Sequence, residues 1–344
     1  MRAAFLAAPL LAALLATPVA AAGQTTEFVS WTNPQDGMPL SGQLSMPAGP
    51  GPFGGVVLLT LAGSDPLVAR LNAQGLAVLR PERRGMVAVE VMLRASFDVL
   101  SADVQSAVDF LRARPDVGDD AVSLVAQGED TPAALIAAAR APITLALLSP
   151  PGFDGTETFR QEQTGTAELR GAGRFTLDSL DLWIEGLART ARSDDDPLVR
   201  DLMIQAFMTE EGMLLPRSAN FPLTMEGQAH FFASQWWWDR FTFDPIPLYG
   251  RLRGPVLVLI GLEDPFTPFD RYFPAIRNAL GRAAGGDAEL CAVRGRARHE
   301  FTEEVSGMLA AWIGRRAAAP GRTLESSADA IVREACIEDP TGLR

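Results

Sequence analysis

Short apolar runs alternate with amphipathic stretches along most of this chain. The run at 54–61, GGVVLLTL, is continuously apolar, which is typical of a strand buried on both faces of a sheet. The stretch 97–114 repeats apolar residues at helical spacing and predicts an amphipathic helix. The same patterns predict an opening hairpin at 27–31 and 40–46, strands at 77–80, 121–126, 144–149, 255–261 and 288–293, and helices at 66–72, 130–139 and 301–314. Strands separated by helices indicate an α/β protein, with a mostly parallel central sheet flanked by helices.

One long insertion interrupts this alternation. Residues 152–249 lack strand patterns and are rich in Leu, Met and aromatic side chains, which predicts an α-helical cap over the carboxyl ends of the strands. The expected organisation is a core of residues 23–151 and 250–316, the cap at 152–249, and a C-terminal extension, 317–344, with a short helix near 326–336.

The first 22 residues have the pattern of a cleaved secretory signal peptide. Arg2 is followed by an apolar stretch at 3–15 and a run of small residues near 20–22. That stretch is shorter than the roughly 20 residues needed to cross a bilayer, and no later stretch is long enough. We therefore expect an exported protein, periplasmic or extracellular, with no membrane span after cleavage.

Composition excludes several classes of function. All 30 basic residues are Arg, so Lys-dependent phosphate loops and Schiff bases are excluded. The two His and two Cys are too few and too scattered for common metal centres. The glycines at 49, 51 and 54 precede a strand, whereas a dinucleotide loop follows one. A net charge of −12 disfavours nucleic acid. We expect no cofactor, no metal and no nucleic-acid partner.

The two cysteines, Cys291 and Cys336, are candidates for a disulfide because export permits one. The alternative is two separate buried thiols.

The turn at 122–130, VSLVAQGED, runs from a strand through a tight turn into a small-residue helix. Here the chain resembles the α/β-hydrolase family, particularly secreted or bacterial esterase and peptidase-like members with a helical cap, over most of 38–314. Further similar segments are the basic turn RPERRG at 80–85, the strand end PVLVLIGLED at 255–264, and RHE at 298–300. The resemblance implies an α/β-hydrolase fold with Asp264 as the acid and His299 as the base, in the family's order.

The chain departs from the family at the nucleophile. Where the family has Gly-x-Ser-x-Gly, this chain has AQGED at 126–130, so Gly128 occupies the serine position. Where the family often has His-Gly at the oxyanion loop, this chain has TLAG at 60–63. The resemblance implies oxyanion or ligand contacts at Leu61, Ala62 and the amide of Glu129. We also expect Glu129 to line the pocket floor and Asp130 to cap the following helix.

Without the serine hydroxyl, the acyl-transfer step loses its nucleophile. The sequence therefore predicts a pseudoenzyme or strongly impaired hydrolase that retains an Asp264 and His299 dyad and a cleft for a small apolar acyl or carboxylate ligand. One alternative is an active ester or peptide hydrolase that uses Ser149, Ser64 or a water activated by His299. A second alternative is a structural or interaction protein with a collapsed pocket.

Within the cap, the run at 236–238 is Trp-Trp-Trp. Such a run is usually core, and Trp237 and Trp238 are also candidates for an apolar wall of the cleft. His230 is expected to have a packing role.

Overall fold

The computed structural model describes residues 24–59, 63–85, 88–193, 196–211, 225–282, 287–295 and 302–317. These residues form one sheet in the order β1-β2-β4-β3-β5-β6-β7-β8. The strands are β1 (Thr25–Thr32), β2 (Pro39–Met46), β3 (Phe53–Leu59), β4 (Leu76–Pro81), β5 (Val117–Gln127), β6 (Thr144–Leu148), β7 (Val256–Gly261) and β8 (Ala288–Val293). Each of the eight predicted strands is present.

The sheet is mostly parallel, as the sequence predicts. The hairpin of β1 and β2 is antiparallel, and β2 pairs antiparallel with β4, whereas all pairs from β4 to β8 are parallel. β3 and β7 are almost wholly buried because both of their faces are covered by helices.

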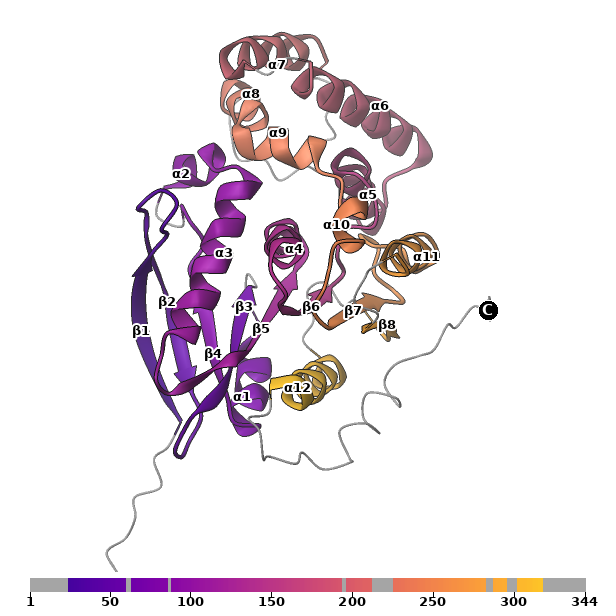
Figure 1. Ribbon diagram of the computed structural model, residues 1–344. Helices are drawn as coiled ribbons and strands as arrows, with labels where there is room; N and C mark the ends of the chain where they lie inside the picture. The colour runs from indigo at the N-terminus through magenta and orange to yellow at the C-terminus, as the bar shows by residue number, and fades with distance from the viewer. Residues whose placement is uncertain are drawn as a thin grey trace, which may run out of the picture.

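Helices cover both faces of the sheet (Figure 1). One face packs against α3 (Phe97–Arg112), α4 (Thr131–Arg140) and α11 (Phe269–Leu280). The other packs against α1 (Asp65–Ala73) and α12 (Glu303–Ala317). The remaining helix of this part is the short α2 (Val89–Arg94). This arrangement confirms the predicted sheet flanked by helices.

Every element described between residues 152 and 249 is a helix, as predicted for the insertion. The helices are α5 (Gly155–Leu169), α6 (Arg174–Ala191), α7 (Pro197–Glu211), α8 (Met225–Ala233), α9 (Gln235–Thr242) and α10 (Ile246–Tyr249). Helices α5 to α9 gather at one end of the sheet (Figure 1). They enclose an apolar core of their own, in which the Trp237 ring packs against Phe159, Phe232 and Phe241.

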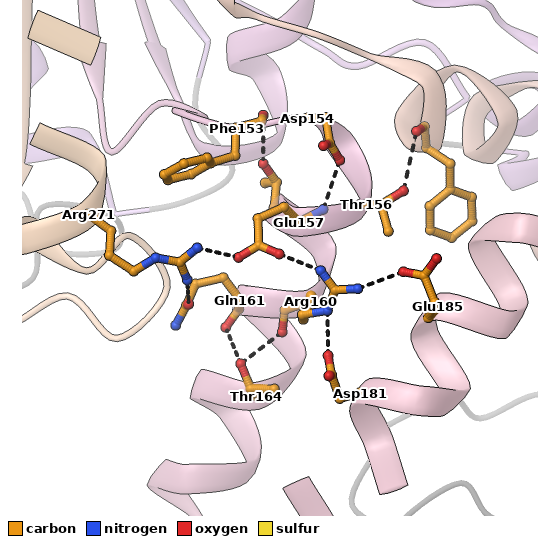
Figure 2. A network of polar contacts seen from close by, with 12 residues as sticks. Phe153, Asp154, Thr156, Glu157, Arg160, Gln161, Thr164, Asp181, Glu185 and Arg271 are labelled. Atoms are coloured by element: carbon orange, nitrogen blue, oxygen red, sulfur yellow. Dashed lines mark hydrogen bonds and ion pairs between the residues drawn. The ribbon is translucent and has the colours of Figure 1, made fainter. Parts of the chain in front are cut away.

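A polar network fastens α5 to its neighbours (Figure 2). Arg160 of α5 pairs with Glu157 of the same helix and with Asp181 and Glu185 of α6. Arg271 of α11 donates to Glu157 at 2.5 Å. Helix α5 is therefore tied both to the rest of the cap and to the core.

Several expectations fall outside the described residues, namely the signal peptide at 1–22, the extension beyond 317 and Cys336. Cys291 lies in β8 and is 1% exposed, and the bridge to Cys336 stays a prediction. Among the described helices, none has the length and apolar character required to cross a membrane.

Candidate functional site

The turn after β5 has the strand, turn and helix order expected of a nucleophile elbow. β5 ends at Gln127, a single 3-10 turn spans Gly128–Asp130, and α4 follows at once. Gly128 has φ of 58°, in the left-handed region that glycine adopts without steric cost. Its carbonyl accepts a hydrogen bond of 2.5 Å from the Thr131 hydroxyl. The apex of the turn is thus well defined and carries no side chain.

Two other predicted site residues, Ser149 and Asp264, are in direct contact. Ser149 follows β6 and Asp264 follows β7, and both are 3% exposed. The Ser149 hydroxyl donates to Asp264 Oδ2 at 2.8 Å, and Phe266 N donates to Asp264 Oδ1 at 2.9 Å. Ser149 has φ of 46°, which is uncommon for a residue with a side chain. The carboxylate therefore has a hydrogen bond on each oxygen.

A small cavity of about 30 Å³ lies beside Gly128. Its wall includes Ser149 from the core and Glu162 and Arg240 from cap helices. Arg240 and Glu162 form an ion pair in which both side chains are largely buried, at 8% exposure for Arg240 and 13% for Glu162. Since Gly128 and Ser149 follow β5 and β6, the cap covers the carboxyl ends of these strands, as predicted.

A second cavity of about 90 Å³ also has Glu129 in its wall, so this side chain, which is 41% exposed, lines both cavities. Its wall is mainly apolar and includes Trp31, Met92, Leu100 and Trp236.

In the wall of this cavity, Arg83 lies 2.7 Å from Asp130 and 3.3 Å from Glu129. Burial raises the pKa of the Asp130 carboxyl above its usual value, and the nearby Arg83 opposes that shift. Asp130 occupies the N-cap position of α4 but makes no side-chain cap bond. The prediction that Asp130 caps α4 is therefore right about its position and wrong about its hydrogen bond, because the carboxylate pairs with Arg83 instead.

The remaining predicted residues are only partly placed. Leu61, Ala62 and His299 lie outside the described residues. Ser64 is 4% exposed next to α1 and does not line either of the two cavities. The predicted role of each stays a prediction.

The three tryptophans at 236–238 lie in different surroundings. Trp237 belongs to the cap core, and Trp238 lines a separate open pocket that shares Phe97 and Phe243 with the 30 Å³ cavity. It is Trp236 that lines the 90 Å³ cavity. His230 is largely exposed, with 73% of its side chain accessible, so its expected packing role is wrong.

Sequence reasoning missed Glu162, Arg240 and Thr267, which all line the 30 Å³ cavity. Glu162 and Arg240 are 78 positions apart, and only the folding of the cap pairs them. Thr267 is three residues after Asp264, and this proximity is the one signal that the sequence offered.

No family model matches the chain, and no curated protein matches it by sequence. Solved structures with a similar fold include the α/β hydrolase GrgF from Penicillium sp. sh18, at 14% identity and a TM-score of 0.53, which covers 86% of this chain and 100% of that one. A carboxyl esterase from Bacillus coagulans aligns at 13% identity and a TM-score of 0.53, over 85% of this chain and 99% of that one. The 2,6-dihydroxy-pseudo-oxynicotine hydrolase aligns at 15% identity and a TM-score of 0.52, over 87% of this chain and 70% of that one.

Proposed function

From its α/β-hydrolase fold, which the solved structures share, and from the glycine at its elbow, we propose that this protein is a pseudoenzyme or strongly impaired hydrolase that binds a small acyl or carboxylate ligand. The observation that carries the proposal is Gly128. It stands at the apex between β5 and α4 with a left-handed backbone and no atom that could attack a carbonyl carbon.

The rest of the site fits a binding role. Asp264 is buried with a hydrogen bond on each carboxylate oxygen, and the cavities of 30 and 90 Å³ border the turn. In a serine hydrolase, loss of the nucleophile lowers kcat by about a millionfold, and residual rate comes from binding and the oxyanion donors. An acyl compound would therefore be held beside Gly128 and turned over slowly or not at all.

The test compares the mature protein with its Gly128→Ser variant, using chromogenic acyl esters of several chain lengths and a fluorophosphonate probe. Gly171→Ser is the matched control, since Gly171 also has a positive φ, of 79°, and lies after α5 in open space. We expect no labelling of the wild type or the control and labelling of Gly128→Ser. Wild-type turnover that His299→Ala abolishes would contradict the proposal.

A second candidate is a hydrolase with Ser149 as a relocated nucleophile. The observation in its favour is that Ser149 lines the same 30 Å³ cavity as Gly128 and contacts Asp264. Against it, the hydroxyl is already directed to a carboxylate and the residue is 3% exposed. Wild-type labelling by fluorophosphonate that Ser149→Ala removes would establish this candidate instead.

Export remains part of the proposal, on the pattern of residues 1–22 alone. Expression of the full chain in a bacterial host, followed by N-terminal sequencing of the periplasmic or culture fraction, tests it. We expect a mature protein that begins near residue 23. An uncleaved protein that stays in the cytoplasm would contradict export.

A further inference from the structure

Strand β1 forms one edge of the sheet and is open on its outer side. In the part of the chain that the structure describes, β1 pairs with β2 alone, and Figure 1 shows it at the outer side of the sheet. An edge strand presents a row of unpaired backbone N–H and C=O groups, to which another strand can add. With eight residues, β1 is longer than the usual strand of about five or six. It therefore offers a long template for pairing.

The sequence of β1, TTEFVSWT, lacks the features that normally prevent pairing between sheet edges. Such features are Pro, Lys, unpaired charges and β-bulges. β1 contains neither Pro nor Lys, and its register with β2 runs without a bulge. The one charged residue, Glu27, lies 3.1 Å from Arg114, which compensates its charge. The Thr, Phe, Val and Trp residues of β1 also favour extended structure. Nothing in this strand opposes the addition of another.

One face of β1 packs against the core, and the other is free. Trp31 stacks on Phe110 of α3, with ring centres 5.1 Å apart, and Val29 packs against the same core. Because side chains alternate between the two faces of a strand, Phe28 belongs to the opposite face, where it is 79% exposed. Thr26 and Ser30 share that face. It therefore presents an aromatic ring between two hydroxyl side chains.

This order of side chains is self-complementary. When two copies of β1 pair antiparallel about a twofold axis perpendicular to the sheet, opposite side chains lie on the same face. With Phe28 on the axis, the two Phe28 rings lie opposite each other, and Thr26 of each copy lies opposite Ser30 of the other. Aromatic pairs and Thr–Ser pairs are both favourable across antiparallel strands. On the core face Glu27 lies opposite Val29, so no like charges are brought together.

We propose that this protein forms a twofold-symmetric dimer in which the β1 strands of two copies pair antiparallel, with Phe28 on the axis. The sheet then runs continuously through both copies. A contact of this kind closes after two copies because each contributes the same surface. The contact is confined to one strand edge, so we expect a dissociation constant in the micromolar range. The dimer does not depend on the proposed ligand binding, and either can fail without the other.

Sedimentation velocity of the mature protein, over a concentration series that extends to about 100 μM, tests the dimer. We expect the wild type to pass from monomer to dimer as the concentration rises. Phe28→Lys brings like charges together on the axis and should weaken dimerisation by about tenfold or more. Phe175→Lys is the matched control, since Phe175 is an exposed aromatic residue of α6, at 85%, and it should dimerise like the wild type.

Disulfide trapping with oxidised glutathione tests the register of the two strands. Phe28→Cys should form a covalent dimer, because residues paired on the axis have Cα atoms about 5 Å apart. Thr26→Cys and Ser30→Cys should each stay monomeric on a non-reducing gel, because the two introduced cysteines would lie about 14 Å apart. A mixture of these two variants should form a covalent dimer. The wild type, treated in the same way, controls for the natural cysteines.

A wild type that stays monomeric throughout the series would overturn the dimer, as would a Phe28→Lys variant that dimerises unchanged. Assemblies that grow beyond two copies would indicate pairing of β1 with β8 of the next copy, and would overturn the twofold arrangement. A covalent dimer formed by Ser30→Cys alone would overturn the register with Phe28 on the axis.

Discussion

The hydroxyl of Ser149 donates a 2.8 Å hydrogen bond to Oδ2 of Asp264, the residue that the sequence predicts as the acid of the site. Both residues are buried, and they come from the ends of neighbouring parallel strands. A carboxylate in this position needs hydrogen bonds because burial without them is costly. Ser149 therefore has a positioning role toward Asp264 that its place in the sequence did not reveal.

Removal of the Ser149 hydroxyl should destabilise the protein, and the extent should depend on the replacement. Ser149→Ala and Ser149→Gly both lose the bond to Asp264, at a cost of about 1–3 kcal/mol. With φ of 46°, the position carries strain in alanine that glycine avoids, so the alanine variant should be less stable by about 0.5–1 kcal/mol. Urea denaturation measures the free energy of unfolding of both variants. Equal stability of the two variants would show that the backbone strain is absent.

Gly128→Ser should have two separate effects, a loss of stability from backbone strain and a gain of reactivity toward the fluorophosphonate probe. A serine at φ of 58° costs about 1–2 kcal/mol, and Gly171→Ser at φ of 79° should cost a similar amount. Thermal denaturation of both variants measures this loss of stability. The fluorophosphonate probe should label only Gly128→Ser. Loss of the fold in Gly128→Ser alone would mean that the elbow cannot accommodate a side chain.

The contact between cap and core at Glu157 should weaken in acid. Burial by itself would raise the pKa of Glu157, but hydrogen bonds from Arg271 and Arg160 outweigh it and hold the pKa below 4.5. A carboxyl group with a lowered folded-state pKa contributes stability above its unfolded pKa and loses it as the pH falls through the folded value. Stability should therefore decline below pH 4.5 in part through this residue.

Glu157→Gln should be less stable than wild type at pH 7 and should show a shallower decline below pH 4.5, measured by urea denaturation across pH. Glu168→Gln, on the exposed end of α5, is the matched control and should keep the wild-type profile. An unchanged acid profile in Glu157→Gln would contradict the role given to the network in Figure 2.

We propose a disulfide between Cys291 and Cys336. Cys291 is 1% exposed in β8, and no free cysteine occurs in the part of the chain that the structure describes. The bridge would close a loop of about 45 residues, worth up to about 4 kcal/mol in the chain-entropy model. Thiol titration of the denatured, unreduced protein should find no free thiol, and Cys336→Ser should lower the melting temperature. Two titratable thiols in the exported protein would disprove the bridge.

The sequence by itself determined the layers of the fold and the glycine at the turn between β5 and α4. Apolar runs such as 256–261 predict buried strands because the spacing of apolar residues within a short segment indicates its secondary structure. The order of strand, turn and helix around Gly128 is also visible within one short segment. That this turn carries no side chain at its apex follows directly from the identity of residue 128.

Only the tertiary structure decided which distant side chains meet. Ser149 and Asp264 are 115 positions apart, and Glu162 and Arg240 are 78 apart, so no local pattern joins them. Trp236, rather than Trp237, reaches a cavity because the rotation of α9 against the cap core selects the face that each ring occupies. Contacts of this kind depend on how helices and strand ends pack in three dimensions, and packing is not encoded in the spacing of any single segment.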